Sequence, residues 1–304
     1  MSDHNGNGVN NRHRSPAPLV TVITACHNTE GYIRQCVQSV KETVTCGKFT
    51  VEHICCDDGS TDNTLESLRH LSRTQCVTDS YAGLRVIGLL HNTKKPSVVR
   101  NEAIKSATGK YIFCLDDDDV LIQNSLRYML NYLEGNPGSR WVYGDFLRVG
   151  KDLQYKPGRD YYGWPHATPQ ELLHSVFRGD HFYQHSLLFE RSLFNEVGGY
   201  DPIIRMGEDL DLCVRFVMSG HMPTHLPTNT HLHRDHGNNM TSHFGREEHM
   251  EDIKNHYTKH QRELRYWLSS SQIADIEKEL GIIGSVEYSK SCDILSPVGS
   301  SVAS

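Results

Sequence analysis

The chain has 304 residues, of which 37% are hydrophobic and 22% charged, a composition that argues against an intrinsically disordered chain and allows a buried core. The formal net charge of −6 argues against a general nucleic-acid binder, which would carry a basic face. No apolar run reaches the roughly 18–20 residues of a transmembrane helix. Residues 1–18 lack the apolar core of a signal peptide, so we expect a cytoplasmic protein with reduced cysteines.

Apolar, β-branched runs alternate with amphipathic segments in the first half of the chain. Each apolar run predicts a buried strand, and each segment with apolar residues three and four apart predicts a helix. In chain order we expect strand 19–25, helix 32–40, strand 49–56, helix 65–71, strand 84–90, helix 97–107, strand 110–115 and helix 124–133. This alternation predicts an α/β fold with a mostly parallel sheet and helices on both faces.

The second half of the chain is less regular. Its patterns predict strands 141–149 and 184–190, helices 192–197, 208–218, 245–268 and 272–280, and a histidine-rich segment from 221 to 249. We therefore expect one domain over 19–245, divided into a nucleotide-binding half (19–140) and an acceptor half (141–245). A helical extension over 246–288 and disordered tails at 1–18 and 289–304 complete the expected organisation.

Polar motifs follow three of the predicted strands, each at the point where the strand ends. His27-Asn28 follows the first strand, Asp57-Asp58 the second, and four aspartates, 116–119, the strand 110–115. Because ligands bind at the carboxyl ends of strands in such sheets, we expect these side chains to line one site.

The four consecutive aspartates have two interpretations. They are either a solvated acidic turn or a cation site, since neighbouring carboxylates raise one another's pKa unless a cation joins them. Oxygen ligands favour Mg²⁺ or Mn²⁺, and Mg²⁺ held by carboxylates commonly bridges to phosphates. The cation interpretation therefore predicts a nucleotide ligand.

The sequence contains no P-loop and no glycine-rich dinucleotide motif after a strand, so basic side chains would have to hold the phosphates. Arg100 is a candidate, although it could equally be an exposed charge on a helix. Glu208-Asp209 at a predicted helix start either complements the helix dipole or supplies a general base.

The ordered set of these motifs resembles family 2 glycosyltransferases, which have a GT-A fold. The segments that carry the resemblance lie between residues 18 and 245 and are VTVITACHN (20–28), DDGSTD (57–62), VRNEA (99–103), LDDDD (115–119) and GED (207–209). Arg234-Asp235-His236 also fits a late Arg-x-His segment of the family.

The resemblance implies transfer of a sugar from a nucleotide-diphosphate donor, expected to be a UDP-sugar, to an acceptor hydroxyl, with inversion. A divalent metal, Mn²⁺ or Mg²⁺, would sit on the diphosphate, and the acceptor would be a glycan, a lipid-linked sugar or a small molecule. The residue roles that it implies are Asp209 as general base beside Glu208, nucleotide contacts by Ala25, His27, Asp58, Arg100, Asp116 and Asp117, and metal contacts by Asp118 and His236.

Two alternatives to this interpretation are a sugar-nucleotide nucleotidyltransferase and a non-catalytic nucleotide-binding module. The first would need a glycine-rich basic loop after the first strand, where this chain has Ala25 to Glu30. The second would be favoured by loss of Asp118 or Asp209, and both are present. A processive synthase would carry membrane helices, which the sequence lacks.

Overall fold

A computed structural model describes residues 19–46, 48–157, 162–180, 187–237, 239 and 245–282. The predicted tails, 1–18 and 289–304, lie outside the described residues, as do residues 184–186 of one predicted strand.

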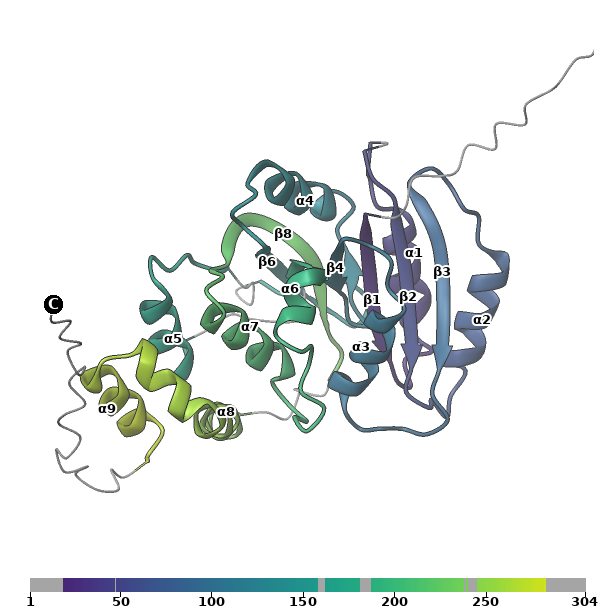
Figure 1. Ribbon diagram of the computed structural model, residues 1–304. Coiled ribbons are helices and arrows are strands. Elements are labelled where there is room, and N and C mark those ends of the chain that lie inside the picture. Colours follow the sequence, from purple (N-terminus) through teal and green to yellow (C-terminus); the bar gives the residue numbers. More distant parts are fainter. Residues whose placement is uncertain are drawn as a thin grey trace, which may run out of the picture.

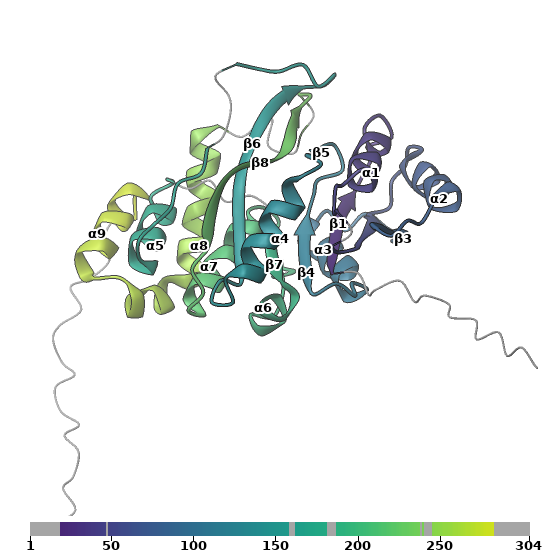
Figure 2. The same cartoon turned by 90° about the horizontal axis from the view of Figure 1, so that it is seen from above.

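The strands form one eight-stranded sheet with the order β3-β2-β1-β4-β7-β6-β8-β5 (Figures 1 and 2). The strands are β1 (Val20–Cys26), β2 (Val51–Asp57), β3 (Tyr81–Gly88), β4 (Tyr111–Cys114), β5 (Val120–Leu121), β6 (Trp141–Gly150), β7 (Leu187–Glu190) and β8 (Thr224–Asp235). The pairs β3/β2, β2/β1, β1/β4 and β6/β8 are parallel, whereas the pairs that involve β7 or β5 are antiparallel. The prediction of a mostly parallel sheet is confirmed.

Helices cover both faces of this sheet. They are α1 (Ile33–Lys41), α2 (Thr64–Thr74), α3 (Pro96–Lys105), α4 (Ser125–Gly135), α5 (Pro169–Phe177), α6 (Arg191–Glu196), α7 (Glu208–Met218), α8 (Arg246–Trp267) and α9 (Ser270–Glu279). Successive residues of a strand point to opposite faces. Val22 of β1 accordingly packs in one apolar core with Ile33 of α1, and Ile23 packs in a second core with Val99 of α3.

The last two helices extend the second core away from the sheet. Tyr257 of α8 and Ile276 of α9 are both fully buried in it, together with Phe177 of α5. Figures 1 and 2 show α5, α8 and α9 gathered at the end of the molecule opposite β3 and α2. Within the described ranges, no helix combines the length and apolar composition needed to cross a membrane.

Two elements of the second half were not predicted from the sequence. The first is α5, whose start carries a recognisable signal, because Thr168 accepts a hydrogen bond from the Glu171 N–H at 3.1 Å and a proline follows it. The second is β8, which occupies much of the histidine-rich segment and pairs with β6 along its length. Its burial does not alternate between buried and exposed positions, since Thr230 and His231 are buried in succession, so no period of two marked it as a strand.

Candidate nucleotide and metal site

A cavity of about 610 Å³ opens at the carboxyl ends of β1, β2 and β4. The loops after these strands supply one side of it, and the starts of α3 and α7 and the end of β8 supply the other. Of the residues predicted to form the site, those that line this cavity are Ala25, His27, Asp58, Arg100, Asp116, Asp117, Asp118, Glu208 and His236.

Asp117 ties the loop after β1 to the aspartate loop after β4. Its Oδ2 accepts hydrogen bonds from the His27 backbone N–H at 3.0 Å and from the Thr29 hydroxyl at 2.7 Å. Burial, together with the charge of Asp118, raises the pKa of Asp117. A cation in the cavity would lower the pKa of Asp117 again, since a positive charge favours the ionised carboxylate.

Asp58 directly follows β2 and is a buried residue. Thr93 donates to both of its oxygens, from the backbone N–H at 2.8 Å and from the hydroxyl at 3.0 Å. Each carboxylate oxygen retains a further lone pair, so a donor group of a nucleotide base can still bind. The exposed His27 ring lies beside it, with Nδ1 3.2 Å from the Asp58 carbonyl oxygen.

Arg100 of α3 is buried and paired with two carboxylates. Its guanidinium donates to Asp116 at 2.9 Å and to Glu208 at the start of α7. Burial alone would lower the pKa of Arg100, but these two carboxylates raise it well above its usual value. Arg100 therefore joins the aspartate loop to the helix that carries Asp209, and a phosphate would have to share its remaining donors.

Asp118 and His236 meet across the cavity, although they are far apart in the chain. His236 Nε2 lies 2.9 Å from Asp118 Oδ2, and the Asn239 amide donates to the same oxygen at 2.9 Å. The His236 ring stacks on Tyr32 with 4.8 Å between the ring centroids, which fixes its orientation. Two ligands at right angles on an Mg²⁺, each about 2.1 Å from it, are about 3 Å apart, so this pair fits one cation.

Asp209 occupies the first turn of α7 and is half-buried. It follows Gly207 and Glu208, which line the cavity, but does not itself belong to the described lining residues. Gly207 has a φ of 66°, a left-handed conformation that suits glycine and turns the chain into the helix. Burial raises the pKa of Glu208, and Arg100 opposes that shift.

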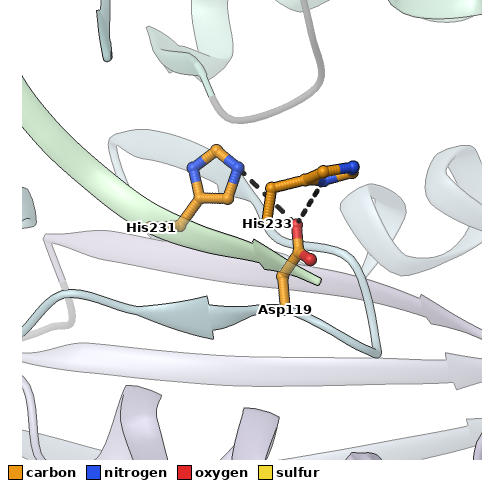
Figure 3. A group of neighbouring side chains, drawn as sticks. All are labelled: Asp119, His231 and His233. Carbon is orange, nitrogen blue, oxygen red and sulfur yellow. Dashed lines mark ion pairs between the residues drawn. The ribbon is translucent and has the colours of Figure 1, made fainter. Parts of the chain in front are cut away.

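One group of site residues was missed by the sequence analysis. His231 and His233 of β8 lie against Asp119, the last of the four aspartates (Figure 3). The only signal in the sequence was the i, i+2 spacing of the two histidines, which places both side chains on the same face of a strand. That signal could be used only if the segment was known to be a strand.

The comparison with protein families matches residues 21–198, more than half of the chain, to a family described as Glycosyl transferase family 2. The match includes the three motifs at the ends of β1, β2 and β4. It ends before Glu208, Asp209 and His236.

Curated relatives are similar over part of their length. The chain is 32% identical over 117 residues to the poly(ribitol-phosphate) beta-glucosyltransferase of Bacillus spizizenii, which is 38% of this chain and 17% of that protein. It is 32% identical over 131 residues to the UDP-Glc:alpha-D-GlcNAc-diphosphoundecaprenol beta-1,3-glucosyltransferase WfgD of Escherichia coli, 42% of this chain and 46% of that protein. The chain thus spans less than half of either relative.

Solved structures share the fold at low sequence identity. Staphylococcus aureus TarS 1-349 in complex with UDP-GlcNAc is similar with a TM-score of 0.58 and 19% identity, over 86% of this chain and 70% of that chain. The mannosyltransferase PcManGT from Pyrobaculum calidifontis, in complex with GDP-Man and Mn²⁺, has a TM-score of 0.57 and 16% identity, over 89% and 77% of the two chains. The chain belongs to glycosyl transferase family 2 and has the GT-A fold.

Proposed function

We propose that the chain transfers a sugar from a UDP-sugar to an acceptor hydroxyl and inverts the configuration at the anomeric carbon. The observation that carries this proposal is the convergence of Asp118, His236 and Glu208 with the nucleotide-side loops in one cavity. Asp58 would bind the base together with His27 and Ala25, and Asp116 and Asp117 would lie at the ribose.

Asp118 and His236 would hold a divalent cation on the donor diphosphate. Carboxylate oxygens from Asp116, Asp118 and Asp119 also gather within 4.8 Å of one another, a set suited to Mn²⁺ or Mg²⁺. When bound, the cation would neutralise charge on the leaving diphosphate. The related mannosyltransferase PcManGT, which forms a complex with GDP-Man and Mn²⁺, supports this proposal.

Asp209 would accept the proton of the attacking hydroxyl, since it is a carboxylate in the first turn of α7 and directly follows Glu208, which lines the cavity. Glu208 would remain paired with Arg100 and hold the start of α7 in place. One base and one displacement give inversion, since the acceptor oxygen enters opposite the leaving diphosphate.

For the wider organisation, we propose that residues 19–140 form the donor half, 141–245 the acceptor half and 246–288 a helical extension. We also propose that the reaction takes place in the cytoplasm.

The proposed acceptor is a glycan, a lipid-linked sugar or a small molecule. The lipid-linked acceptor in the name of WfgD supports a lipid-linked sugar.

A thermal-unfolding screen tests the choice of donor. Binding of a ligand to the folded state raises stability by about 2.7 kcal/mol at 100 times its Kd, and we expect a rise of several degrees in the unfolding midpoint. UDP-Glc, UDP-GlcNAc and GDP-Man are each added with Mn²⁺ and with EDTA. We expect a rise with a UDP-sugar only when Mn²⁺ is present, whereas a larger rise with GDP-Man would contradict the choice of base.

A further inference from the structure

A second set of cation ligands lies deeper in the sheet than the pair Asp118–His236. Asp119, at the end of the aspartate loop, and His231 and His233 of β8 bring their ligand atoms within 4.8 Å of one another (Figure 3). Asp119 is fully buried and His231 is 1% exposed. The glycosyl-transfer reaction proposed above gives no role to His231 or His233, and it uses Asp119 only as a neighbour of the carboxylates of Asp116 and Asp118.

The hydrogen bonds of His231 determine which of its nitrogens faces Asp119. The Thr230 hydroxyl donates its proton to the Asp145 carbonyl oxygen at 3.0 Å, and the same hydroxyl lies 2.9 Å from His231 Nδ1. The hydroxyl must therefore accept a hydrogen bond from Nδ1–H. In the neutral ring, Nε2 then presents a lone pair toward Asp119 Oδ2, 3.6 Å away.

The Asp119 carboxylate has one satisfied and one unsatisfied oxygen. Oδ1 accepts the Arg234 backbone N–H at 2.8 Å. Oδ2 is buried and accepts no hydrogen bond from any described residue, with His233 Nδ1 at 3.4 Å as a further neighbour. A buried carboxylate oxygen that faces an imidazole lone pair is costly unless a proton or a cation lies between them.

We propose that Asp119, His231 and His233 bind a borderline divalent transition-metal ion, of which Zn²⁺ is the representative. Ligand atoms of a tetrahedral Zn²⁺ site lie about 3.3 Å apart, since each bond is about 2.0–2.1 Å long. The two Asp119 distances of 3.4 and 3.6 Å are close to that value. Two nitrogen ligands select such an ion over Mg²⁺.

The surroundings of the cluster fit a metal centre. The Nδ1–H···Oγ hydrogen bond to Thr230 orients the His231 ring, as the outer partners of metal-bound histidines commonly do. The His231 ring also stacks on Phe146 with 5.1 Å between centroids. His233 lines the donor cavity, which gives the ion a route of entry and leaves a fourth position for water. The bound ion would join the aspartate loop to β8.

The test uses the full chain, freed of metal with a chelator and titrated with Zn²⁺ against a chromogenic chelator in excess Mg²⁺. We expect one tightly bound Zn²⁺ per chain, and visible absorption bands of tetrahedral type when Co²⁺ replaces it. Asp119→Asn keeps the acceptor for Arg234 but removes the ligand oxygen, and should weaken Zn²⁺ binding by about 100-fold or more, as should His231→Gln.

Two control variants separate this site from its neighbours. His236→Ala removes the ligand proposed for the donor's cation, and His225→Gln changes a β8 histidine that pairs with Asp145 at 2.8 Å. Both should retain Zn²⁺ binding. The proposal is wrong if the metal-free wild-type chain binds no Zn²⁺, if Asp119→Asn binds it unchanged, or if His236→Ala alone abolishes binding.

Discussion

Arg100 illustrates how single residues join the two halves of the cavity. Its guanidinium bonds Asp116 after β4 and Glu208 at the start of α7, so it links the aspartate loop to the helix of the proposed base. Removal of such a buried partner leaves two uncompensated carboxylates, which is far more costly than loss of an exposed ion pair.

Asp209→Asn is expected to lower the rate of sugar transfer by about 100-fold to 10,000-fold, the contribution typical of a general base. The amide cannot accept the hydroxyl proton, whereas the hydrogen bond from Leu210 N–H at 2.8 Å can be retained by the amide oxygen. Transfer is measured as release of nucleoside diphosphate, with donor affinity measured alongside. Full turnover in the variant, or an equal loss of donor affinity, would exclude Asp209 as the base.

The sequence indicated Asp118 and His236 through their motifs, although 118 residues separate them, and the structure brings their side chains together. The sequence did not indicate that Asp119 lies beside His231 and His233. That proximity depends on where β8 lies relative to the aspartate loop, which the sequence pattern does not show. Nor could it show that Arg100 is already paired twice, since its partner Glu208 lies 108 residues away.

At the scale of elements, α8 holds α7 through one buried carboxylate. Asp211 of α7 is fully buried and lies 2.8 Å from both His260 Nε2 of α8 and Arg215 Nε of its own helix. Lys259 of α8 pairs with it as well. Burial alone would raise the pKa of Asp211, but these partners hold it well below its usual range.

Asp211→Asn should therefore lower the free energy of unfolding by about 3 kcal/mol at pH 7, measured by urea denaturation. Because the folded-state pKa is lowered, the stability that Asp211 contributes is present above its unfolded-state value of about 3.9 and is lost as the pH falls below it. The difference between wild type and variant should accordingly shrink between pH 5 and pH 3.

Asp201→Asn is the matched control, since Asp201 also pairs with Lys259 at 2.7 Å but is half-exposed. Asp201→Asn should lower the free energy of unfolding by about 1 kcal/mol or less. Equal losses in the two variants, or a difference for Asp211→Asn that stays constant with pH, would contradict the buried network.

The sequence predicted elements correctly where apolar residues recur with a clear helical period. An example is α7, whose predicted and observed limits are both 208–218. The prediction failed for β8, because Pro227 interrupts the run and the register with β6 shifts between Gly144 and Phe146. Thr230 and Arg234 of β8 are polar but buried, so hydropathy could not reveal that this segment is an internal strand.

At the scale of the whole molecule, β7 lies between the parallel strands around β1 and the parallel pair β6/β8, and it is antiparallel to both of its neighbours, β4 and β6 (Figure 2). The alternation of strands and helices predicted the first part. The position of β7 between β4 and β6 could not be predicted, because the order of strands along the chain does not determine which strands pair in the sheet. That arrangement brings the end of β8, and hence His236, to the cavity.

Calorimetric titration of the chain with UDP tests the central claim, that Asp118 and His236 bind the donor's diphosphate through a divalent cation. We expect binding in Mn²⁺ or Mg²⁺ that EDTA weakens by at least about tenfold, a difference of 1.4 kcal/mol. Asp118→Asn should bind UDP as weakly in Mn²⁺ as wild type does in EDTA, with its unfolding midpoint unchanged. Equal UDP affinity in Mn²⁺ and EDTA, or in the variant and wild type, would contradict it.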